Sequence, residues 1–583
     1  MKIEQLKKYG LFITVPLVLS ACVDDSYDLT DLDTTSEFQV KDLVLPMNLD
    51  EIYLKNIIDV KDSEQISIIN DQYVFIEEGG FSSENITIPQ VVIPAPNIEP
   101  VTSTIELGEI PGITPKAFDN LEISYPINSI LSDFAYATSS VSDYIVSMDK
   151  VGVDFRVSIK FEIKGVEDVV NKFTLRNFSL QIPAGLDLST TNGNYNKKTG
   201  ILTLLDQKYD SNIIEFSVII NGIDLNESNL EYNHNEHSVN FAGQVGIYSG
   251  EIVVTGADFA EGFNILKLPK SIELVTHFNL SDIVIKTFSG EINYALDGLS
   301  IPPVEIGNIP DILGQDETDI VLNNPQIYLQ FNNPLAQYNL TAQAGVTITT
   351  SRDNLPDQQY TLDNDYFTIS GTADNNINTL CLSPAIPDVY YQGYEQATHI
   401  PYTSLSYLLS GKGLPKSIAV EITNPTVPTQ KVNDFALGQN IGNIQGRYSF
   451  YAPLELKSGS KIVFATTVDG WSNENIDAIT IKKLDIHANV TNNLPLDIEI
   501  FAYPVDVNGN RINDVEIRGF ELDANTTNNP LNITLTGEIN RFDGIYFEAV
   551  ATSPEGNSSL NPTEFIHLQD FKITVSGNYI TKF

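Results

Sequence analysis

The sequence predicts an all-β fold made of several antiparallel β-sandwich domains in tandem, and three observations support this prediction. Apolar and polar residues alternate, most clearly from Val153 to Ile163, where every second residue is apolar. This period is typical of a strand that has one face on a core and the other in water. Turn-forming pairs such as Asn508-Gly509 separate the apolar runs. Ile-Pro pairs recur at positions that suit strand starts and sheet edges, because proline cannot donate a ladder hydrogen bond.

Strand-like runs of this kind follow one another along the chain. They lie at 153–163, 213–220, 462–468, 496–501, 531–539 and 571–580. Asn-Gly and Asp-Gly pairs tolerate the positive φ of tight hairpin turns, which predicts hairpins at Asn192-Gly193, Asn221-Gly222, Asp297-Gly298, Asp469-Gly470, Asn508-Gly509 and Asp543-Gly544. One short helix is predicted over 404–410, with Thr403 as its cap and Gly411 as its stop; its inward-facing residues are Leu405, Leu408 and Leu409.

Joints marked by proline or glycine divide the chain into consecutive segments. The expected order is a signal peptide (1–21), an acidic tether (22–42), an N-terminal β region (43–115), a β-sandwich (116–265), a β-sandwich with the short helix near its end (266–410) and a C-terminal β-sandwich region (411–583). The sandwiches are expected to be Ig-like, since short alternating strands separated by turn pairs are typical of that architecture.

The first residues have the form of an export signal. Lys2, Lys7 and Lys8 precede an apolar run over 9–18, which is too short to span a bilayer. Leu19-Ser20-Ala21-Cys22 then resembles the lipobox of bacterial lipoproteins, and the acidic residues Asp24 and Asp25 resemble the tract that directs Bacteroidetes lipoproteins to the cell surface.

This resemblance implies that Cys22 is lipidated and that the protein is anchored in the outer membrane, facing the cell exterior. Two or three acyl chains on one cysteine would give stable attachment, whereas a single chain binds only marginally. The alternative is an ordinary secretory signal that is cut nearby, with Cys22 incidental.

Charge and cysteine content exclude several classes of partner. The chain has 33 Lys and Arg residues against 76 Asp and Glu residues, for a formal net charge of −43. Nucleic acid is therefore not an expected partner, because its phosphates need positive potential. Cys381 is the only cysteine besides Cys22, so no intramolecular disulfide is expected once Cys22 is lipidated. Cys381 lies in an apolar run and is predicted to be a buried, unreactive thiol.

Aromatic residues offer the most useful indication of a binding surface. Tyr390, Tyr391 and Tyr394 lie within a tyrosine-rich stretch that ends at Tyr407. A tyrosine presents a flat apolar face and a polar tip, which suits recognition of sugars or proteins. Trp471 follows the predicted turn Asp469-Gly470 and is a further candidate contact. The alternative is that these rings simply pack on the core.

No motif predicts catalysis, a metal or a cofactor. His234 and His237 are predicted to lie on strand and turn, without a third ligand. The stretch from Asp506 to Asp514 has oxygens at alternate positions, but Arg511 takes the place where a calcium loop needs glycine, so a hairpin turn is the better interpretation. The sequence has no Gly-x-Ser-x-Gly elbow, phosphate-binding loop or His-Glu-x-x-His motif.

These observations predict a lipid-anchored surface protein with a non-catalytic role in binding, adhesion or assembly. Its expected partners are the outer membrane, reached through the lipid, and a glycan or another surface protein. An alternative is a glycan-binding accessory of a polysaccharide-uptake system, with Tyr390, Tyr391, Tyr394 or Trp471 as stacking platforms. A carbohydrate-active hydrolase, which needs only two suitably placed acids, is a third hypothesis.

Overall fold

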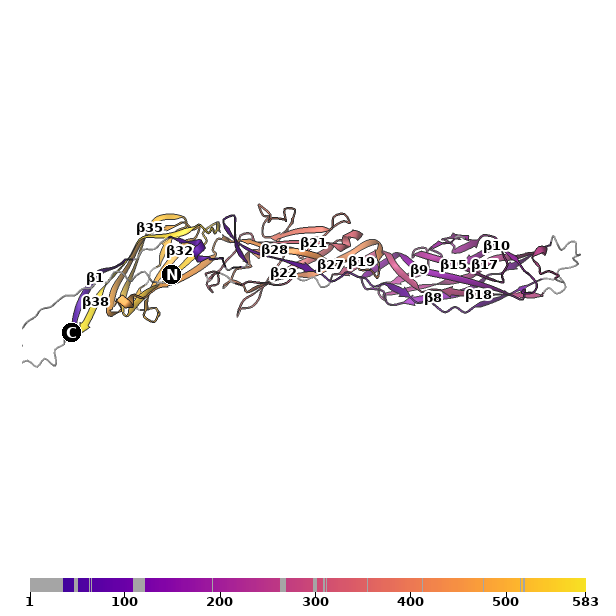
Figure 1. Cartoon of the computed structure of the whole chain (residues 1–583), viewed down its shortest axis with the longest axis horizontal. Coiled ribbons are helices and arrows are strands. Elements are labelled where there is room, and N and C mark those ends of the chain that lie inside the picture. Colours follow the sequence, from indigo (N-terminus) through magenta and orange to yellow (C-terminus); the bar gives the residue numbers. More distant parts are fainter. Residues whose placement is uncertain are drawn as a thin grey trace, which may run out of the picture.

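The computed structural model describes residues 35–46, 51–61, 63, 65–107, 121–190, 192–262, 269–296, 301–307, 310, 312–353, 355–411, 413–474, 476–513, 515–516 and 519–582. These residues form a long rod with three lobes, which Figure 1 shows end to end. We call them the proximal, middle and distal lobes, the proximal lobe being the one that contains the first and last described strands. Nearly all of the regular structure is strand in antiparallel sheets, so the predicted all-β fold with several β-sandwiches is confirmed.

The proximal lobe joins the two ends of the described chain. β1 (Thr35–Pro46) runs antiparallel to β38 (Phe565–Lys582), with Thr35 opposite Lys582. Beside β38 its sheet continues with β31 (Ile479–Asn492), β35 (Thr526–Ile539) and β33 (Val515–Glu516), and β2 (Ile52–Tyr53) also pairs with β38. A second sheet has the order β30 (Lys461–Val468), β36 (Phe542–Thr552), β32 (Asp497–Asp506) and β34 (Phe520–Leu522). The remaining elements are α1 (Leu54–Ile57), η6 (Trp471–Glu474), η7 (Ile476–Ala478) and the pair β29 (Glu455–Lys457) and β37 (Asn557–Ser559).

The middle lobe contains a six-stranded sheet that we call the middle sheet. Its order is β26 (Thr398–Pro401), β25 (Ile377–Ser383), β21 (Gln326–Asn332), β28 (Gln445–Pro453), β4 (Gln72–Ser82) and β3 (Ile66–Ile69). Ile327, Leu329 and Phe331 of β21 belong to the main core, whereas Tyr328 belongs to a second cluster on the opposite, outer face. The lobe also contains β5 (Val91–Ile93), β19 (Ile283–Ala295), β20 (Val304–Glu305), η4 (Pro334–Tyr338), β22 (Ala342–Ser351), β23 (Gln358–Thr361), β24 (Phe367–Ile369), η5 (Thr403–Tyr407) and β27 (Ser417–Ala436).

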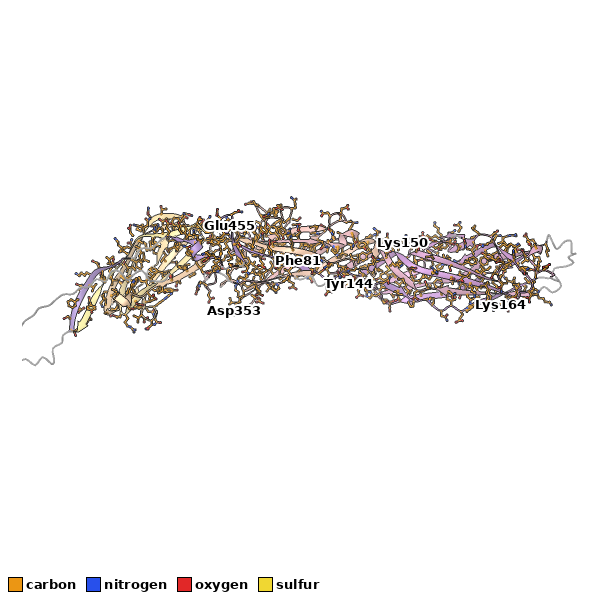
Figure 2. The ribbon with its side chains drawn as sticks, in the orientation of Figure 1. Phe81, Tyr144, Lys150, Lys164, Asp353 and Glu455 are labelled. Atoms are coloured by element: carbon orange, nitrogen blue, oxygen red, sulfur yellow. The ribbon has the colours of Figure 1, made fainter. Side chains whose placement is uncertain are left out.

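The distal lobe is built around β9 (Ile145–Lys164), a strand of 20 residues. At about 3.3 Å per residue, such a strand extends for about 65 Å. Figure 2 shows Lys150 near the joint with the middle lobe and Lys164 near the far end, so β9 runs along the rod. The lobe's other elements are β6 (Val101–Glu106), β7 (Glu122–Ile127), β8 (Ile130–Thr138), β10 (Phe173–Gln181), β11 (Leu186–Ser189), β12 (Gly193–Asn196), β13 (Ile201–Leu204), β14 (Gln207–Tyr209), β15 (Ile213–Asp224), β16 (Leu230–Asn233), β17 (Ser238–Thr255), η2 (Gly256–Asp258) and β18 (Ser271–Leu280).

One 12-stranded sheet connects the middle and distal lobes. Its main path is β11-β15-β9-β19-β27-β22-β23, and β19 pairs with β9 along one edge and with β27 along the other. The two lobes are therefore joined by a ladder of backbone hydrogen bonds. The sheets of the proximal lobe are separate from this one.

The predicted segment boundaries do not separate these lobes. Strands from the predicted 116–265, 266–410 and 411–583 segments share the 12-stranded sheet, and β4 from the 43–115 segment pairs with β28. The predicted tether over 22–42 is also wrong for residues 35–42, which belong to β1. Alternation identifies a strand but carries no information about its partner, and several of these partners lie hundreds of residues away in sequence.

The hairpin turns predicted at Asn-Gly and Asp-Gly pairs are confirmed at one position and wrong at others. Gly509 has a φ of 78° and its N–H donates to the Asp506 carbonyl at 2.8 Å, so the turn at 508–509 is confirmed. Gly470 has positive φ but leads into η6, and the strands before and after it, β30 and β31, belong to different sheets, so the hairpin predicted at 469–470 does not form. The pair at 192–193 crosses from one sheet to another instead of closing a hairpin. The pair at 297–298 lies outside the described residues.

Two predicted hairpin turns are wrong because each glycine lies within a strand. Gly222 belongs to β15, at a bulge where the register shifts against β9. A Cβ atom there would lie 3.2 Å from the Val151 carbonyl oxygen, so glycine allows a close backbone approach. Gly544 belongs to β36, and the preceding turn instead uses Arg541, which has a φ of 58°.

The predicted short helix is a 3-10 helix, η5, over Thr403–Tyr407. Its inward-facing residues are confirmed, because Leu405, Leu408 and Leu409 are all buried. The hydroxyl of Thr403 donates to Asp363 at 2.5 Å and does not cap the helix.

Candidate functional site on the outer face of the middle sheet

The tyrosine-rich stretch forms a cluster with residues from the middle sheet. Strand alternation places Tyr328 on the outer face of β21, and the register sets it opposite Cys381 on one side and Ser449 on the other. The segment 384–397, which connects β25 to β26, brings Tyr390, Tyr391 and Tyr394 to this face. We call this group, together with Tyr451 of β28, the tyrosine cluster: Tyr328, Tyr390, Tyr391, Tyr394 and Tyr451.

Ring contacts and hydrogen bonds fix the geometry of the tyrosine cluster. The rings of Tyr328 and Tyr394 are 4.8 Å apart, and Tyr391 stacks on Tyr451 at 4.8 Å with an interplanar angle of 24°. The Tyr328 hydroxyl donates to Gln326 Oε1 at 2.5 Å and accepts from the Tyr391 N–H at 3.0 Å. Burial raises the pKa of the Tyr328 hydroxyl, so the group stays a neutral donor.

Hydrogen bonds connect the tyrosine cluster to β4. The Tyr394 hydroxyl and Ser449 Oγ lie 2.9 Å apart, and Ser449 Oγ donates to Glu78 Oε1 at 3.1 Å. The guanidinium of Arg447 lies 5.0 Å from the centre of the Tyr394 ring and donates to Gln330 Oε1 at 3.1 Å. The outer face of the middle sheet therefore combines aromatic rings with amide, hydroxyl and charged groups.

The candidate contacts differ in how far they reach solvent. Tyr394 is only 2% exposed, so the prediction that it contacts a ligand is corrected: its ring packs between the sheet and the 384–397 segment. Tyr390 and Tyr391 are partly buried, and each keeps part of its surface open. Tyr402 is fully buried and donates to the Tyr360 carbonyl at 2.7 Å, while Tyr407 is half exposed.

Sequence reasoning missed the apolar tip of the same segment. Ile386 is 66% exposed and Val389 is 81% exposed, immediately before the tyrosine pair. Isolated exposed apolar residues are common, but these two lie within five residues of two partly exposed tyrosines on one segment, and we call Ile386 and Val389 the apolar patch. The sequence indicated this only through the unusual placement of Ile386-Pro387 and Val389 outside any strand-like run.

Trp471 lies in the proximal lobe and is not part of the tyrosine cluster. It begins η6, is partly buried, and its ring packs 5.2 Å from that of Phe542. The Ser472 N–H donates to Asp543 Oδ1 at 2.7 Å, which holds this turn against β36. The predicted exposed tryptophan at a hairpin tip is therefore corrected to a side chain that covers the proximal core.

The remaining sequence candidates take structural roles. Cys381 is fully buried and burial raises the pKa of its thiol, as expected for an unreactive group. His234 and His237 have ring centroids 5.8 Å apart, and His234 Nδ1 lies 3.0 Å from the Ile145 carbonyl oxygen. Within the described ranges, no group of three or more His, Cys, Asp or Glu side chains is arranged to hold a metal ion.

The Asp506 loop is held by its own hydrogen bonds. Asp506 Oδ1 accepts from the backbone N–H of Asn508 at 2.8 Å and of Asn510 at 3.0 Å. The guanidinium of Arg511 lies over the rings of Tyr503 and Tyr546. This is the geometry of a hairpin turn, as the sequence predicted.

The predicted lipidation and export residues Cys22, Asp24 and Asp25 lie outside the described residues. In the part of the chain that the structure covers, no helix is both long and apolar enough to cross a membrane.

No protein-family model matches the chain, and no curated protein matches it. Among solved structures, one described as a "putative secreted protein" from Parabacteroides distasonis ATCC 8503 aligns with 50% of this chain and 90% of its own, at 16% identity and a TM-score of 0.35.

Proposed function

We propose that the protein is a lipid-anchored rod on the outer face of the outer membrane, with a non-catalytic role in binding, adhesion or assembly. The observation that carries this proposal is the placement of the chain ends. The first and last described strands pair at one end of the rod, and the distal lobe lies at the other (Figure 1). Thr35 follows Cys22 by 13 residues in the sequence, so a lipid on Cys22 would hold the proximal end.

A rod held at one end presents its middle and distal lobes to partners. The net charge of −43 keeps neighbouring molecules apart through mutual repulsion and favours solubility at a crowded surface. The apolar patch at Ile386 and Val389 favours a protein partner at the tyrosine cluster, because apolar side chains gain most from burial against a complementary protein surface.

Anchoring and orientation are tested in the producing bacterium. We expect palmitate labelling of the native chain and its loss in Cys22→Ala, because the thiol is the acceptor. We expect protease added to intact cells to digest the chain as completely as protease added to lysed cells. Protection in intact cells would overturn the exterior placement, and undiminished labelling of Cys22→Ala would overturn the anchor.

The apolar patch is tested by cross-linking on intact cells. We expect the double substitution Ile386→Ser and Val389→Ser to abolish the cross-linked products of the native chain. Leu205, which is 68% exposed in the distal lobe, offers a matched control in Leu205→Ser. An unchanged cross-linking pattern in the double variant would show that partners bind elsewhere.

A further inference from the structure

A polar cavity lies at the end of the middle sheet, where β21 ends and β28 begins. Its volume is about 360 Å³, within the range of about 300–1,000 Å³ that is usual for small-molecule sites. The cavity opens to solvent, and three chain segments line it: η4 with the residues before it, the tight turn around 372–375, and the stretch that leads into β28. The lining residues are Asn332, Asn333, Pro334, Gln337, Ala373, Asn376, Ile441, Gly442, Asn443 and Gln445.

The lining of this cavity is neutral and rich in carboxamides. Six of its ten residues are Asn or Gln, and none of the ten is charged. This contrasts with the whole chain, in which 76 residues are acidic. A carboxamide offers two donors and an acceptor oxygen at one planar group, so the cavity presents donors and acceptors together without a net charge.

Local hydrogen bonds hold the lining in place. Asn333 caps η4: its Oδ1 accepts from the Leu335 N–H at 3.0 Å and its Nδ2 donates to the Leu340 carbonyl at 3.2 Å. Asn332 joins the two strands, because its Oδ1 accepts from the Gln445 N–H at 2.6 Å and its Nδ2 donates to the Asn443 carbonyl at 3.2 Å. The site is therefore ordered without a ligand, which lowers the entropy cost of binding.

Three other carboxamides keep hydrogen-bonding capacity for a ligand. Gln337 Nε2 donates to the Pro334 carbonyl at 3.1 Å, and Gln445 Nε2 donates to Asn443 Oδ1 at 3.2 Å. Each uses one donor, and neither Oε1 has a partner among the described residues. Asn376 contributes its carbonyl to the Asn333 N–H at 2.7 Å, and its side chain is exposed at the cavity.

This chemistry selects one class of ligand. An anion would need a cationic side chain, and a metal ion would need carboxylates, so neither matches the lining. An apolar ligand would leave the carboxamides without water or partners. A polyol matches, because each hydroxyl both donates and accepts a hydrogen bond. We propose that this cavity binds a neutral saccharide; the proposal gives a ligand class to the binding role proposed above and so rests on it.

The surrounding face lets a saccharide chain continue beyond the cavity. Tyr328, Gln330 and Asn332 share the outer face of β21 by strand alternation, and Arg447 bridges to Gln330 between the two ends. Asn332 is four residues from Tyr328, which is about 13 Å along a strand. Carboxamides therefore lie at one end of this face, and the partly exposed rings of Tyr390 and Tyr391 lie at the other.

The test uses native affinity electrophoresis of the full-length Cys22→Ala chain in gels that contain dextran, mannan, xylan or inulin, with heparin as an anionic comparison. We expect retardation by at least one of the four neutral polysaccharides and none by heparin. Retardation by heparin alone, or by none of the five, would overturn the proposal.

Variants then assign the site. Gln337→Met and Gln445→Met keep side-chain length but remove the carboxamide, and Ala373→Trp fills the cavity; each is expected to weaken binding at least tenfold. Gln359→Met, at an exposed glutamine on β23, is the matched control and should bind as the parent does. Unchanged thermal unfolding confirms that each variant is folded.

Two further results distinguish binding at the cavity from binding at the tyrosine cluster, and failure of this proposal from failure of the exterior placement. Full binding by all three cavity variants, with loss in Tyr390→Ala or Tyr391→Ala, would place the saccharide on the tyrosine cluster and overturn the cavity assignment. The protease test on intact cells does not involve saccharide, so failure of the exterior placement and failure of this site are distinguished.

Discussion

Glu564 places a carboxyl group at the joint between the proximal and middle lobes. Its carbonyl accepts from the Leu54 N–H at 2.7 Å and its Oε2 accepts from the Asn561 N–H at 3.1 Å. Burial raises the pKa of this carboxyl to about 7. Across the joint, burial and the charges of Glu564 and Asp59 together raise the pKa of the Tyr73 hydroxyl to about 12. Single residues at this joint therefore couple stability to pH.

The raised pKa of Glu564 predicts that the fold loses stability as pH rises from about 4.5 to about 7. The folded state holds the proton more tightly than the unfolded chain, so stability is highest below the unfolded pKa and levels off above pH 7. We expect Glu564→Gln, which keeps an acceptor oxygen for Asn561, to be about 2 kcal/mol more stable than the parent at pH 8. Urea unfolding at pH 5 and pH 8 measures this.

The exposed Glu555 of the same lobe provides the comparison. Glu555→Gln should leave the pH dependence of the urea midpoint as it is in the parent. Equal stability of Glu564→Gln and the parent at pH 8 would contradict the assigned role of Glu564.

Asp258 shows the opposite case, a buried carboxylate that is fully paired. Its side chain is 1% exposed, contacts Lys208 Nζ, and accepts from the backbone N–H and hydroxyl of Thr255 at 2.9 and 2.7 Å. Burial opposes ionisation, but these hydrogen bonds outweigh it and lower the pKa of the Asp258 carboxyl. The stability that it contributes is present above the unfolded pKa, near 4, and is lost as pH falls further.

We therefore expect Asp258→Asn to cost about 2 kcal/mol at pH 7, since it removes the charge-assisted hydrogen bonds of a buried carboxylate, while the Lys208 amine, whose side chain is 47% exposed, stays solvated. The cost should shrink at pH 3, because the unfolded chain then binds a proton at Asp258 and the stability gained from the lowered folded-state pKa decreases. Thermal unfolding at both pH values measures the difference, and a cost that is the same at both would refute the ionic explanation.

At the scale of elements, the strands were predictable and their partners were not. The alternation over 153–163 is confirmed inside β9, where its six apolar residues are buried. The same local pattern could not show that β1 pairs with β38 across more than five hundred residues. The hairpin turns predicted at 221–222 and 543–544 were wrong for a similar reason. Gly222 and Gly544 allow close packing within strands, and the sequence does not distinguish a glycine of this kind from one in a turn.

The candidate site shows the same limit. Crowding in the sequence predicted that Tyr390, Tyr391 and Tyr394 lie near one another, and the structure confirms this. The crowding of tyrosines in the sequence could not predict that Tyr328 and Tyr451 join the cluster, because the register of β21 and β28 brings them there. The carboxamide cavity was also beyond local reasoning, because its lining comes from three separate segments.

The pairing of β19 with β9 predicts a strong effect of one added methyl group. A Cβ atom at Gly290 would lie 2.1 Å from the Ser147 carbonyl oxygen, and backbone cannot rotate away as a side chain can. We expect Gly290→Ala to lower the free energy of unfolding by about 2–3 kcal/mol, as overpacking does. Gly307→Ala is the control, because nothing lies within 4 Å of the added atom. Similar urea midpoints for the two variants would contradict the close approach.

At the scale of the whole molecule, the chain runs out along the rod and returns. The proximal lobe uses residues before β3 and after β28, the middle lobe uses two further stretches inside these, and the distal lobe uses one stretch between them. The proximal and middle lobes are each built from two stretches of chain. Each is therefore complete only when the residues between its two stretches are also in place. The shared 12-stranded sheet ties the middle lobe to the distal lobe, whereas the proximal lobe meets the middle lobe through isolated bridges, such as Leu322 to Leu456 of β29 and Asp319 to Lys461 of β30.

This difference predicts that the middle and distal lobes unfold together and the proximal lobe unfolds separately. Trp471, the only tryptophan, reports on the proximal lobe alone, while circular dichroism reports on all the strands. Phe241→Ala in the distal core and Ile348→Ala in the middle core should each cost about 3–5 kcal/mol and shift the same dichroism transition. The Trp471 fluorescence midpoint should not move in either variant, and Ile573→Ala in β38 should move it without moving the other transition. If Phe241→Ala shifts the fluorescence midpoint as far as Ile573→Ala does, the whole rod unfolds as one unit, and the bridges at β29 and β30 are as strong as the continuous sheet.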